Sequence, residues 1–531
     1  MTFVITQNCC TDASCVPVCP ADCIRPAPDT AGTAAPMLYI DPASCVDCGA
    51  CVAVCPVGAI YHEDDLPESQ LRFKTINADY FAGTPLDIRA TPARWSPTPV
   101  GRDALRVAVV GAGPAACYAV ADLTRSPGVR VDVFDRLPTP YGLVRFGVAP
   151  DHQHTKDITS VFDTALSGPS VQCYFNVGVG TDVTHEQLTA SYDAVIYATG
   201  ATRSRELGIP GERLPGSVAA ADFVNWYNGH PDHAEATFPL DSERAVIIGN
   251  GNVALDVARI LVLDEATLRA TDIAEHALNE LRRSAVREVV ILARRGAGAG
   301  AFSVGELMAL GSLPDVDIVV EGALGERPDD HEGALKFDIV GEYATRPTVA
   351  GRRRRIVLRF GARPLQVSGT ERVEALVIED GDETSTIETS MVLRAIGYRS
   401  APVPGLPSDP DTGVVSNHAG RVTSDGAPVP GLYVTGWIKR GPRGVIGTNR
   451  LCARETVESL LADAAAGRLP TPTAQPEAIR ARLGEQGVPV VDWSGWRLID
   501  DAERAQGSVA DRPRVKVVDR AALLTAAGVA G

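Results

Sequence analysis

The sequence predicts an α/β protein in which two domains built on parallel sheets, one inserted in the other, follow a small cysteine-rich α+β domain. The stretches 106–122 and 245–256 each contain a short apolar strand, a glycine-rich turn and the start of a helix. Nine of the twelve cysteines lie within the first 55 residues. Several domains are expected in a chain of 531 residues, because single cores seldom exceed about 250–300 residues.

The composition argues against two kinds of partner, nucleic acids and membranes. Hydrophobic residues make up 45% and charged residues 22% of the chain, which indicates a globular protein. The net charge of −16 argues against a nucleic-acid partner held by a broad basic surface. No apolar run approaches the roughly 18 residues of a membrane span, and the opening MTFVITQNCC lacks the pattern of a secretion signal. We therefore expect a cytoplasmic protein with neither a membrane nor a nucleic-acid partner.

The first glycine-rich turn has the spacing of a dinucleotide-binding loop. In the sequence GAGPAA, Gly111 permits the tight turn, Gly113 lets the backbone approach a pyrophosphate, and Ala116 allows close packing of the helix on the strand. A second strand ends in Asp135, where a ribose-binding carboxylate belongs. The pattern predicts a Rossmann-like domain, and an ordinary glycine turn is the less favoured alternative. The predicted binding residues are Gly111, Gly113, Ala115, Ala116 and Asp135.

A second dinucleotide-binding motif lies in AVIIGNGNVALD, residues 245–256, which repeats the spacing at Gly249, Gly251 and Ala254. The next strand, in EVVILARRG, ends in Arg294 and Arg295 where an NAD enzyme would carry an acidic residue. Arginine favours a 2′-phosphate, so the motif predicts NADP rather than NAD, with solvated strand-end charges as the alternative. The predicted NADP-binding residues here are Asn250, Gly251, Asn252, Val253, Arg294 and Arg295.

The cysteine run CVDCGACVAVCP at residues 45–56 has the C-x2-C-x2-C-x3-C-P spacing of iron–sulfur proteins with two clusters. The last cysteine of such a run, Cys55, serves the other cluster. Cys19, which also precedes a proline, is expected to complete the [4Fe–4S] set through the pseudo-symmetry of the fold. Zinc is less favoured because four ligands would leave most of the cysteines unused. Disulfides do not suit a reducing cytosol. The predicted ligands of this cluster are Cys19, Cys45, Cys48 and Cys51.

Residues 2 to about 81 resemble the seven-iron bacterial ferredoxins, through the opening strand, a C-x3-C-P-x2-C segment at 15–23, MLYIDPASCVDCGACVAVCP and INADYF. The resemblance implies a [3Fe–4S] cluster held by Cys9, Cys15 and Cys55, with Cys23 as a neighbour that is not a ligand. Cys10 is an additional thiol. Two alternatives stay open: Cys10 as the ligand in place of Cys9, and a second [4Fe–4S] cluster.

The segments PTPYGLVRFGVAPDH (138–152) and GLYVTGWIKRGPRGVIGTNR (431–450) are similar to signatures of the adrenodoxin-reductase-like ferredoxin–NADP reductases. That family has FAD in one dinucleotide-binding domain and NADPH in the other. The resemblance implies that His152 lies near the flavin–nicotinamide junction as a tentative catalytic residue, with an ordinary surface histidine as an equal alternative. It places Glu306 at the NADP site and Gly444 beside both cofactors. Further FAD contacts implied by the resemblance are Leu143, Val179, Arg205, Trp437, Gly444, Val445 and Ile446.

These patterns predict a division of the chain. Residues 1–83 form a two-cluster ferredoxin domain, and the proline-rich stretch 84–104 is a linker. Residues 105–203 and 401–531 form the FAD domain, and residues 204–400 form the NADP domain. The arginine run 352–355 is expected in a solvated hairpin turn, with docking of the acidic ferredoxin domain as a lesser alternative. No chemistry is apparent after about residue 469.

The sequence thus predicts a ferredoxin fused to a ferredoxin–NADP(+) reductase. NADPH would deliver hydride to FAD, and single electrons would pass through the clusters to an acceptor such as a ferredoxin, a cytochrome P450 or another redox enzyme. The alternatives are an electron-input subunit of glutamate-synthase type and a redox sensor read by a partner. A disulfide reductase is less favoured because the nucleotide-binding domains contain no C-x-x-C.

Overall fold

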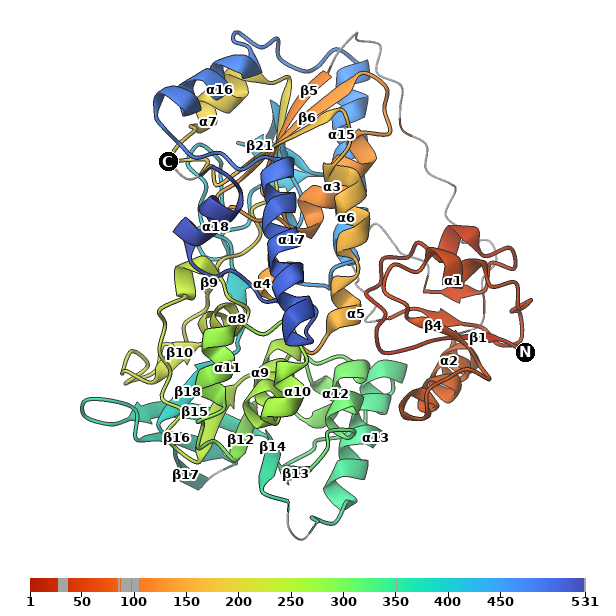
Figure 1. The fold of residues 1–531 in the computed structure, drawn as a ribbon. Coiled ribbons are helices and arrows are strands. Elements are labelled where there is room, and N and C mark those ends of the chain that lie inside the picture. Colours follow the sequence, from red (N-terminus) through yellow and green to blue (C-terminus); the bar gives the residue numbers. More distant parts are fainter. Residues whose placement is uncertain are drawn as a thin grey trace.

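The computed structural model describes residues 1–26, 37–84, 86, 97, 105–349, 352–381 and 383–529. The predicted linker at 84–104 lies outside the described residues except for 84, 86 and 97. Two sheet-based domains stand one above the other, and a small N-terminal lobe lies beside their junction (Figure 1). The predicted α/β class with two Rossmann-like domains and a ferredoxin-like lobe is confirmed.

The N-terminal lobe consists of two short antiparallel strand pairs, β1–β4 and β2–β3, and two helices. Helix α2 is joined to both pairs by the buried Asn77, whose side-chain oxygen accepts hydrogen bonds from the N–H groups of Ile5 and Ile40. This contact fixes the helix against the strands that flank the cysteine loops. The elements are β1 (Phe3–Ile5), β2 (Ile24–Arg25), β3 (Tyr39–Ile40), α1 (Ala50–Val54), β4 (Ile60–His62) and α2 (Arg72–Gly83).

The upper domain is built on a seven-stranded sheet in the order β20-β21-β22-β8-β5-β6-β7, in which β22 to β7 run parallel. Strands β5 and β8 are almost fully buried, as expected for the centre of a parallel sheet. The strands are β5 (Leu105–Val110), β6 (Val129–Asp135), β7 (Val171–Phe175), β8 (Ala194–Tyr197), β20 (Asn417–His418), β21 (Arg421–Ser424) and β22 (Ala427–Val434). The helices are α3 (Pro114–Leu123), α4 (Leu143–Phe146), α5 (Gln153–Lys156), α6 (Thr159–Leu166), α7 (His185–Ser191), α14 (Trp437–Arg440), α15 (Thr448–Ala465), α16 (Pro476–Glu485), α17 (Trp493–Ala510) and α18 (Arg520–Ala526).

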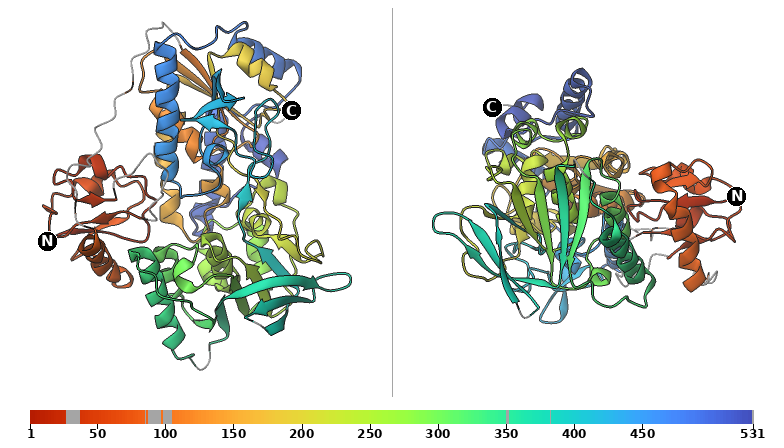
Figure 2. Two further views of the ribbon diagram at one scale, coloured as in Figure 1. Left: turned by 180° about the vertical axis from the view of Figure 1, so that it is seen from behind. Right: turned by 90° about the horizontal axis from the view of Figure 1, so that it is seen from below.

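The lower domain has a six-stranded parallel sheet in the order β10-β18-β11-β12-β14-β13, whose strands lie side by side in the view from below in Figure 2. It also has a separate three-stranded antiparallel sheet. Its strands are β10 (Ser217–Ala219), β11 (Arg244–Ile248), β12 (Glu288–Ala293), β13 (Val316–Gly322), β14 (Arg354–Phe360), β15 (Ala362–Ser368), β16 (Ala375–Asp380), β17 (Glu383–Glu388) and β18 (Met391–Arg394). Its helices are α8 (Ala220–Tyr227), α9 (Asn252–Val262), α10 (Glu265–Arg269), α11 (Glu275–Leu281), α12 (Val304–Leu310) and α13 (His331–Thr345).

The chain crosses between the two sheet domains twice. The outward crossing, β9 (Arg203–Ser204), pairs with the return crossing, β19 (Tyr398–Arg399), as a short antiparallel ladder. The two large sheets lie on either side of this ladder. The crossings fall close to the predicted domain boundaries at 203 and 400, and those boundaries stay a prediction.

The arginine run 352–355 does not lie in a hairpin turn. It leads from α13 into β14, which pairs in parallel with β13. Arg352 donates to the carbonyl of Val316 and to Asp317, and Arg354 donates to the carbonyl of Val262. These contacts lie within the lower domain, whereas among the described residues the ferredoxin-like lobe meets that domain elsewhere, for example at Glu342 and His331. The lesser alternative, docking of the lobe on this run, is therefore wrong.

His230 gives a pH-dependent contribution to stability near the domain crossing. The side chain is buried against Phe146, and this burial lowers the pKa of His230 to about 4. The folded state therefore holds the neutral ring, whereas the unfolded chain takes up a proton below about pH 6.5. We expect the free energy of unfolding to fall by up to about 3 kcal/mol as the pH drops from 6.5 through 4.

Chemical denaturation of the wild type and of His230→Gln across this pH range measures that contribution. The variant should lose the part of the pH dependence that His230 supplies. An NMR titration that places the pKa of His230 at or above 6.5 would contradict the expectation.

Candidate functional site

The first glycine motif forms the turn that the sequence predicts. Gly111 has φ +107°, and a Cβ built on it would lie 2.6 Å from the carbonyl oxygen of Ala198, so only glycine fits. Gly113 is extended, and a Cβ there would meet nothing within 4 Å. Helix α3 begins next with Pro114 and has no side-chain cap. No side chain caps the N–H groups of its first turn, an arrangement that suits a phosphate.

Asp135 ends β6 directly beside this turn. Its carboxylate accepts hydrogen bonds from the N–H groups of Ala112 at 2.7 Å and Leu137 at 2.9 Å. Burial raises the pKa of Asp135, although both hydrogen bonds oppose that rise. The carboxylate is therefore held at the edge of the turn.

The segment 138–152 passes over the glycine motif. The N–H of Tyr141 donates to the carbonyl of Ala112 at 2.8 Å, and a Cβ on Gly142 would lie 3.1 Å from the Cα of Gly113. Leu143, at the start of α4, is 41% exposed. An exposed leucine beside an open turn suits contact with a flat aromatic group.

The returning segment 436–446 closes the same region. A Cβ on Gly436 would lie 2.6 Å from the Cβ of Ala115 in α3. Trp437 stacks on Tyr398 with ring centroids 5.9 Å apart, and its Nε1–H donates to the carbonyl of Arg443. The Nε and Nη1 donors of Arg440 are buried without a hydrogen-bond partner. Unpaired buried donors are costly, so these atoms fit a group that accepts hydrogen bonds, such as a bound dinucleotide.

The remaining residues predicted for the flavin lie around this region. Gly444 has φ +82°, and the N–H of Val445 donates to Thr448 Oγ1 at the start of α15. Ile446 is half-buried. Arg205 donates to the carbonyl of Tyr398, which links it to the Trp437 stack. Val179 pairs with Val183 on the sheet side of the domain. The roles of these residues stay predictions.

The second glycine motif repeats the geometry of the first. Gly249 has φ +110°, and a Cβ there would lie 2.3 Å from the carbonyl oxygen of Ala395. Gly251 precedes α9, which has no side-chain cap, and Asn250, Asn252 and Val253 are half-buried around it. Asn252 Oδ1 accepts a hydrogen bond from the N–H of Ser303. Just beyond β12, the side chains of Arg294 and Arg295 are exposed.

His152 lies in a cluster of charged side chains between the two domains. Arg259 of α9 is buried and donates to Asp151, Asp256 and Glu306. Its Nη2 also lies 2.9 Å from His152 Nε2. A guanidinium can only donate, so a hydrogen bond here requires Nε2 as the acceptor. Burial raises the pKa of Asp256 to about 6, although Arg259 opposes the rise.

The cluster bears on two questions: whether its side chains hold a metal ion, and how exposed His152 is. The ligand atoms of His152, Asp256 and Glu306 lie within 4.8 Å of one another, a spacing that could suit a metal ion, but Arg259 already supplies the cation to all three. The side chain of His152 is 20% exposed, so it is not an ordinary solvated loop histidine. Nothing in the local sequence pattern indicated Arg259.

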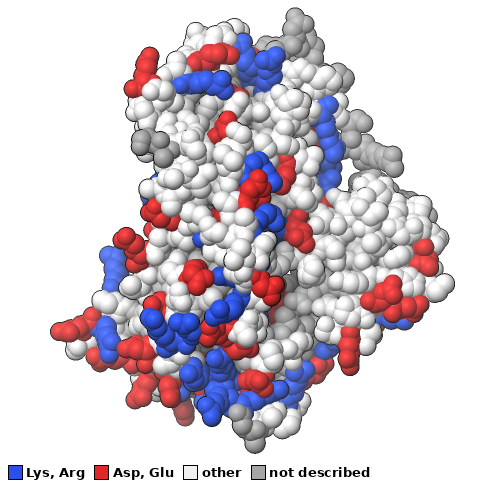
Figure 3. Space-filling model, viewed as in Figure 1, with Lys and Arg blue, Asp and Glu red and all other residues white. Residues whose placement is uncertain are grey.

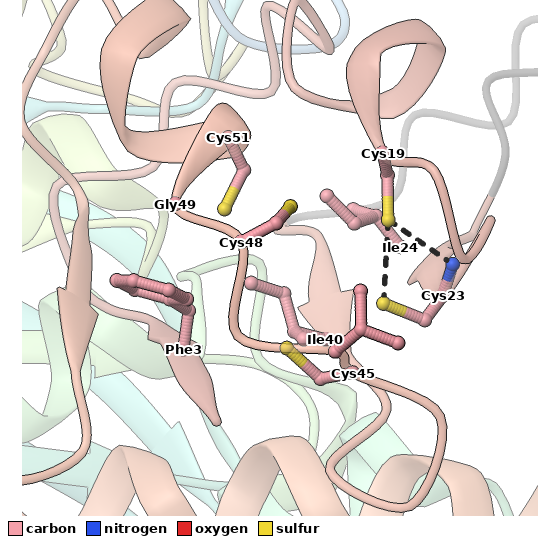
Figure 4. A pocket seen from close by; sticks show the side chains of 10 residues that line it. Phe3, Cys19, Cys23, Ile24, Ile40, Cys45, Cys48, Gly49 and Cys51 are labelled. Carbon is pink, nitrogen blue, oxygen red and sulfur yellow. Dashed lines mark hydrogen bonds between the residues drawn. The ribbon is translucent and has the colours of Figure 1, made fainter. Parts of the chain in front are cut away.

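Four predicted cluster ligands surround one small pocket in the N-terminal lobe. Cys19, Cys45, Cys48 and Cys51 line it, together with Phe3 and Ile40, and their sulfur atoms gather around one space (Figure 4). Gly49, with φ +70°, turns the chain so that α1 can begin between Cys48 and Cys51. The thiols of Cys19 and Cys23 lie 3.4 Å apart, so Cys23 is a direct neighbour of this set. Four convergent thiols fit an iron–sulfur cluster.

The other three predicted ligands, Cys9, Cys15 and Cys55, are close enough for their thiols to interact electrostatically. Burial, followed by repulsion from Cys9 and Cys55, raises the pKa of the Cys15 thiol. The same causes, burial first and then nearby negative charges including Cys9 and Cys55, raise the pKa of Cys10. Cys9, Cys15 and Cys55 are therefore neighbours, and Cys10 is close enough to stay an alternative ligand.

The C-terminal segment joins the two sheet domains, a role that the sequence did not suggest. Glu503 of α17 is fully buried and accepts from Arg145 of α4 and from Arg514. Arg512 donates to Glu275 and to the carbonyls of Thr271 and Ile273 in the lower domain. The segment therefore ties α4 of the upper domain to the lower domain.

Comparison with known proteins agrees with this architecture. Residues 105–296 match a family described as pyridine nucleotide-disulphide oxidoreductase, and residues 38–61 match a 4Fe-4S binding domain. A probable ferredoxin/ferredoxin–NADP reductase of Mycobacterium tuberculosis is 46% identical over 554 residues, covering 99% of this chain and 95% of the relative. The mitochondrial NADPH:adrenodoxin oxidoreductase of Arabidopsis thaliana is 38% identical, covering 80% of this chain and 95% of the relative.

A solved structure, FprA from Mycobacterium tuberculosis in complex with NADPH, is 39% identical with a TM-score of 0.74, covering 80% of this chain and 99% of that one. The fold, the two dinucleotide motifs and the cysteine-rich lobe define an oxidoreductase of the flavoprotein and iron–sulfur class. The chain belongs to the ferredoxin–NADP reductase family, in the branch that carries a ferredoxin domain of its own. Among the described residues, no helix is long and apolar enough to cross a membrane.

Proposed function

We propose that this protein oxidises NADPH and passes the electrons, one at a time, through its own ferredoxin domain to an external redox protein. Bound FAD would convert the hydride of NADPH into single electrons, and the iron–sulfur clusters would carry them. The acceptor is a one-electron carrier such as a ferredoxin or a cytochrome P450. Clustered thiolate ligands suit a reducing compartment, so we place the protein in the cytoplasm.

The observation that carries this proposal is the occurrence of two glycine turns in separate domains with open helix N-termini. Gly113 and Gly251 each leave room for a pyrophosphate. The returning segment 436–446, with the unpaired donors of Arg440, supports assignment of FAD to the upper turn. The exposed Arg294 and Arg295 support NADPH at the lower one.

The chain's own residues would divide the work. Gly111, Gly113, Ala115, Ala116 and the carboxylate of Asp135 would hold the FAD pyrophosphate and ribose, and the 141–143 and 437–446 segments would enclose the flavin. Asn250, Gly251, Asn252 and Val253 would hold the NADPH pyrophosphate. His152, oriented by Arg259 and supported by Glu306, would line the junction where the two cofactors meet.

For the clusters, we propose a [4Fe–4S] centre on Cys19, Cys45, Cys48 and Cys51. A second centre on Cys9, Cys15 and Cys55 would hold three irons, or four if Cys10 contributes. The pocket that Cys19, Cys45, Cys48 and Cys51 line together supports the first set.

Flavin, iron and sulfide analysis of the purified protein, combined with NADPH-driven reduction of ferricyanide and of a ferredoxin, tests the function. We expect one FAD per chain, two clusters with distinct EPR signals, and rapid oxidation of NADPH. A protein loaded with FAD and clusters that fails to oxidise NADPH would refute the proposal. It would leave the redox-sensor alternative.

Nucleotide preference gives a sharper expectation. Replacing Arg294 and Arg295 by alanine should lower kcat/KM for NADPH by about 10–100-fold, because charged hydrogen bonds contribute about 1.5–3 kcal/mol. The value for NADH should stay within about twofold, since NADH lacks the 2′-phosphate. Arg363→Ala is a matched control, because Arg363 pairs with Glu379 at the surface of the same domain. An equal loss with both nucleotides would contradict the assignment.

A further inference from the structure

The ferredoxin-like lobe docks on the upper domain directly beside the segment proposed to enclose the flavin. The N–H of Gly447 donates to the carbonyl of Cys10 at 2.9 Å. A Cβ on Gly447 would lie 2.2 Å from the backbone carbon of Thr11 and 2.3 Å from the backbone nitrogen of Asp12. Gly447 follows Ile446, so the cysteine loop and the 444–447 loop meet backbone to backbone.

A buried charged contact fixes this approach. Asp12 is 4% exposed and accepts from Arg450 Nη1 at 2.8 Å and from the hydroxyl of Tyr118 at 2.8 Å. Tyr118 lies on α3, the helix that follows the first glycine motif, and Arg450 lies on α15. Charge-assisted hydrogen bonds away from water are stronger and more directional than exposed ones. The contact therefore sets the register between the cysteine loop and the upper domain.

The two sets of thiols lie differently with respect to this contact. Cys9, Cys10 and Cys55 pack in the same apolar cluster as Ile446 and the residues of α3. The four-cysteine pocket, by contrast, is lined only by residues of the lobe itself. Cys48 is exposed there, and the neighbouring Val46 is 61% exposed. Of the three-cysteine set, Cys9 and Cys55 thus pack toward the upper domain, whereas Cys15 packs with Cys51 inside the lobe. The four-cysteine set opens toward solvent.

We infer that the three-cysteine centre is the inlet that receives electrons from the flavin and that the four-cysteine centre passes them to the external acceptor. The inference rests on the proposed function and adds the order of transfer. Each step moves one electron from the reduced flavin to the inlet centre and then to the second centre, with NADPH as the source of the pair. Because electron transfer slows steeply with distance, Asp12, Arg450 and Tyr118 act as positioning residues for the first step.

The test uses the full-length protein with both changes on the upper domain, Arg450→Gln and Tyr118→Phe, so that the cysteine loops keep their sequence. We expect NADPH to reduce the three-cysteine centre at least about tenfold more slowly than in the wild type. Reduction of the flavin by NADPH, and of ferricyanide by the flavin, should stay within about twofold. In the wild type, rapid freeze-quench EPR should show the signal of the three-cysteine centre changing before that of the four-cysteine centre.

A second measurement is independent of turnover. Hydrogen exchange of the Gly447 amide should be slow in the wild type and faster in the double variant, because its acceptor is the carbonyl of Cys10. The matched control is Arg72→Gln, which removes the exposed pair with Glu342 where the lobe meets the lower domain. The control should change neither the exchange of Gly447 nor the rate of cluster reduction by more than about twofold.

Three outcomes would overturn the inference. The first is reduction of the four-cysteine centre before the three-cysteine centre, and the second is fast hydrogen exchange of the Gly447 amide in the wild type. The third is an unchanged rate of cluster reduction in a double variant whose Gly447 amide exchanges faster. Failure of the proposed function looks different. In that case NADPH would not reduce the flavin at all, while the exchange of Gly447 would still report the docking.

Discussion

Replacing Asp272 by asparagine is expected to lower the free energy of unfolding by about 3–5 kcal/mol, because it removes the counter-charge of two buried lysine side chains. Asp272 is 4% exposed and accepts from Lys156 Nζ at 2.6 Å. Lys516 Nζ, which is 1% exposed, lies 3.1 Å from the other oxygen. Burial alone would raise the pKa of Asp272, but the two lysines outweigh it and hold the pKa well below its usual range.

Denaturant unfolding at neutral pH, followed by circular dichroism, measures this loss. Asp338→Asn is the control, since Asp338 pairs with Arg327 at an exposed site where a salt bridge contributes about 0–1 kcal/mol. The three partners come from α5, the loop before α11 and the C-terminal segment. Loss of the contact should therefore also loosen the junction of the two sheet domains. A loss below about 1 kcal/mol for Asp272→Asn would contradict the expectation.

Alanine substitution should affect different properties at the two glycines, FAD affinity at Gly113 and stability at Gly111. Gly113 has an extended backbone and empty space around its missing Cβ, so Gly113→Ala should fold normally. The new methyl group would occupy the space proposed for the pyrophosphate and should weaken FAD binding by about tenfold or more, which corresponds to about 1.4 kcal/mol. Gly111→Ala should instead destabilise the protein by at least about 1–2 kcal/mol, because of its positive φ and the contact with the carbonyl of Ala198.

Isothermal titration of the flavin-free protein with FAD, together with thermal unfolding of the same samples, separates the two effects. The Gly113 variant should keep its flavin-free melting temperature and lose affinity. If Gly113→Ala bound FAD as tightly as the wild type, the pyrophosphate would not approach this turn.

The features predicted correctly from the sequence are those encoded by short-range spacing. A strand, a glycine turn and a helix lie within about 17 residues, so the pattern around Gly111 fixes the local backbone. The run from Cys45 to Cys51 likewise brings three thiols together within one turn and one short helix. Both motifs have the predicted local geometry because few other backbone conformations are compatible with their residue spacing.

The contacts that sequence reasoning missed join distant segments. Arg259 meets Asp151 across 108 residues, and Asp12 meets Arg450 across 438. No periodicity or spacing links such positions, because each partner lies at the surface of its own domain until the domains pack. The arginines at 352–355 were misplaced for a related reason. A charge run shows exposure to solvent, but the pairing of β13 and β14 is set by the crossover helix α13 between them.

The ferredoxin-like lobe touches both sheet domains at once. Its Tyr39–Tyr80 stack meets the ring of His331 at the start of α13, while Asp12 is held by Arg450 in the upper domain (Figure 1). On the face drawn in Figure 3 the lobe fills the corner between them. A rotation of one sheet domain relative to the other would have to break one of these two contacts. The lobe therefore bridges the two sheet domains and restrains their relative movement.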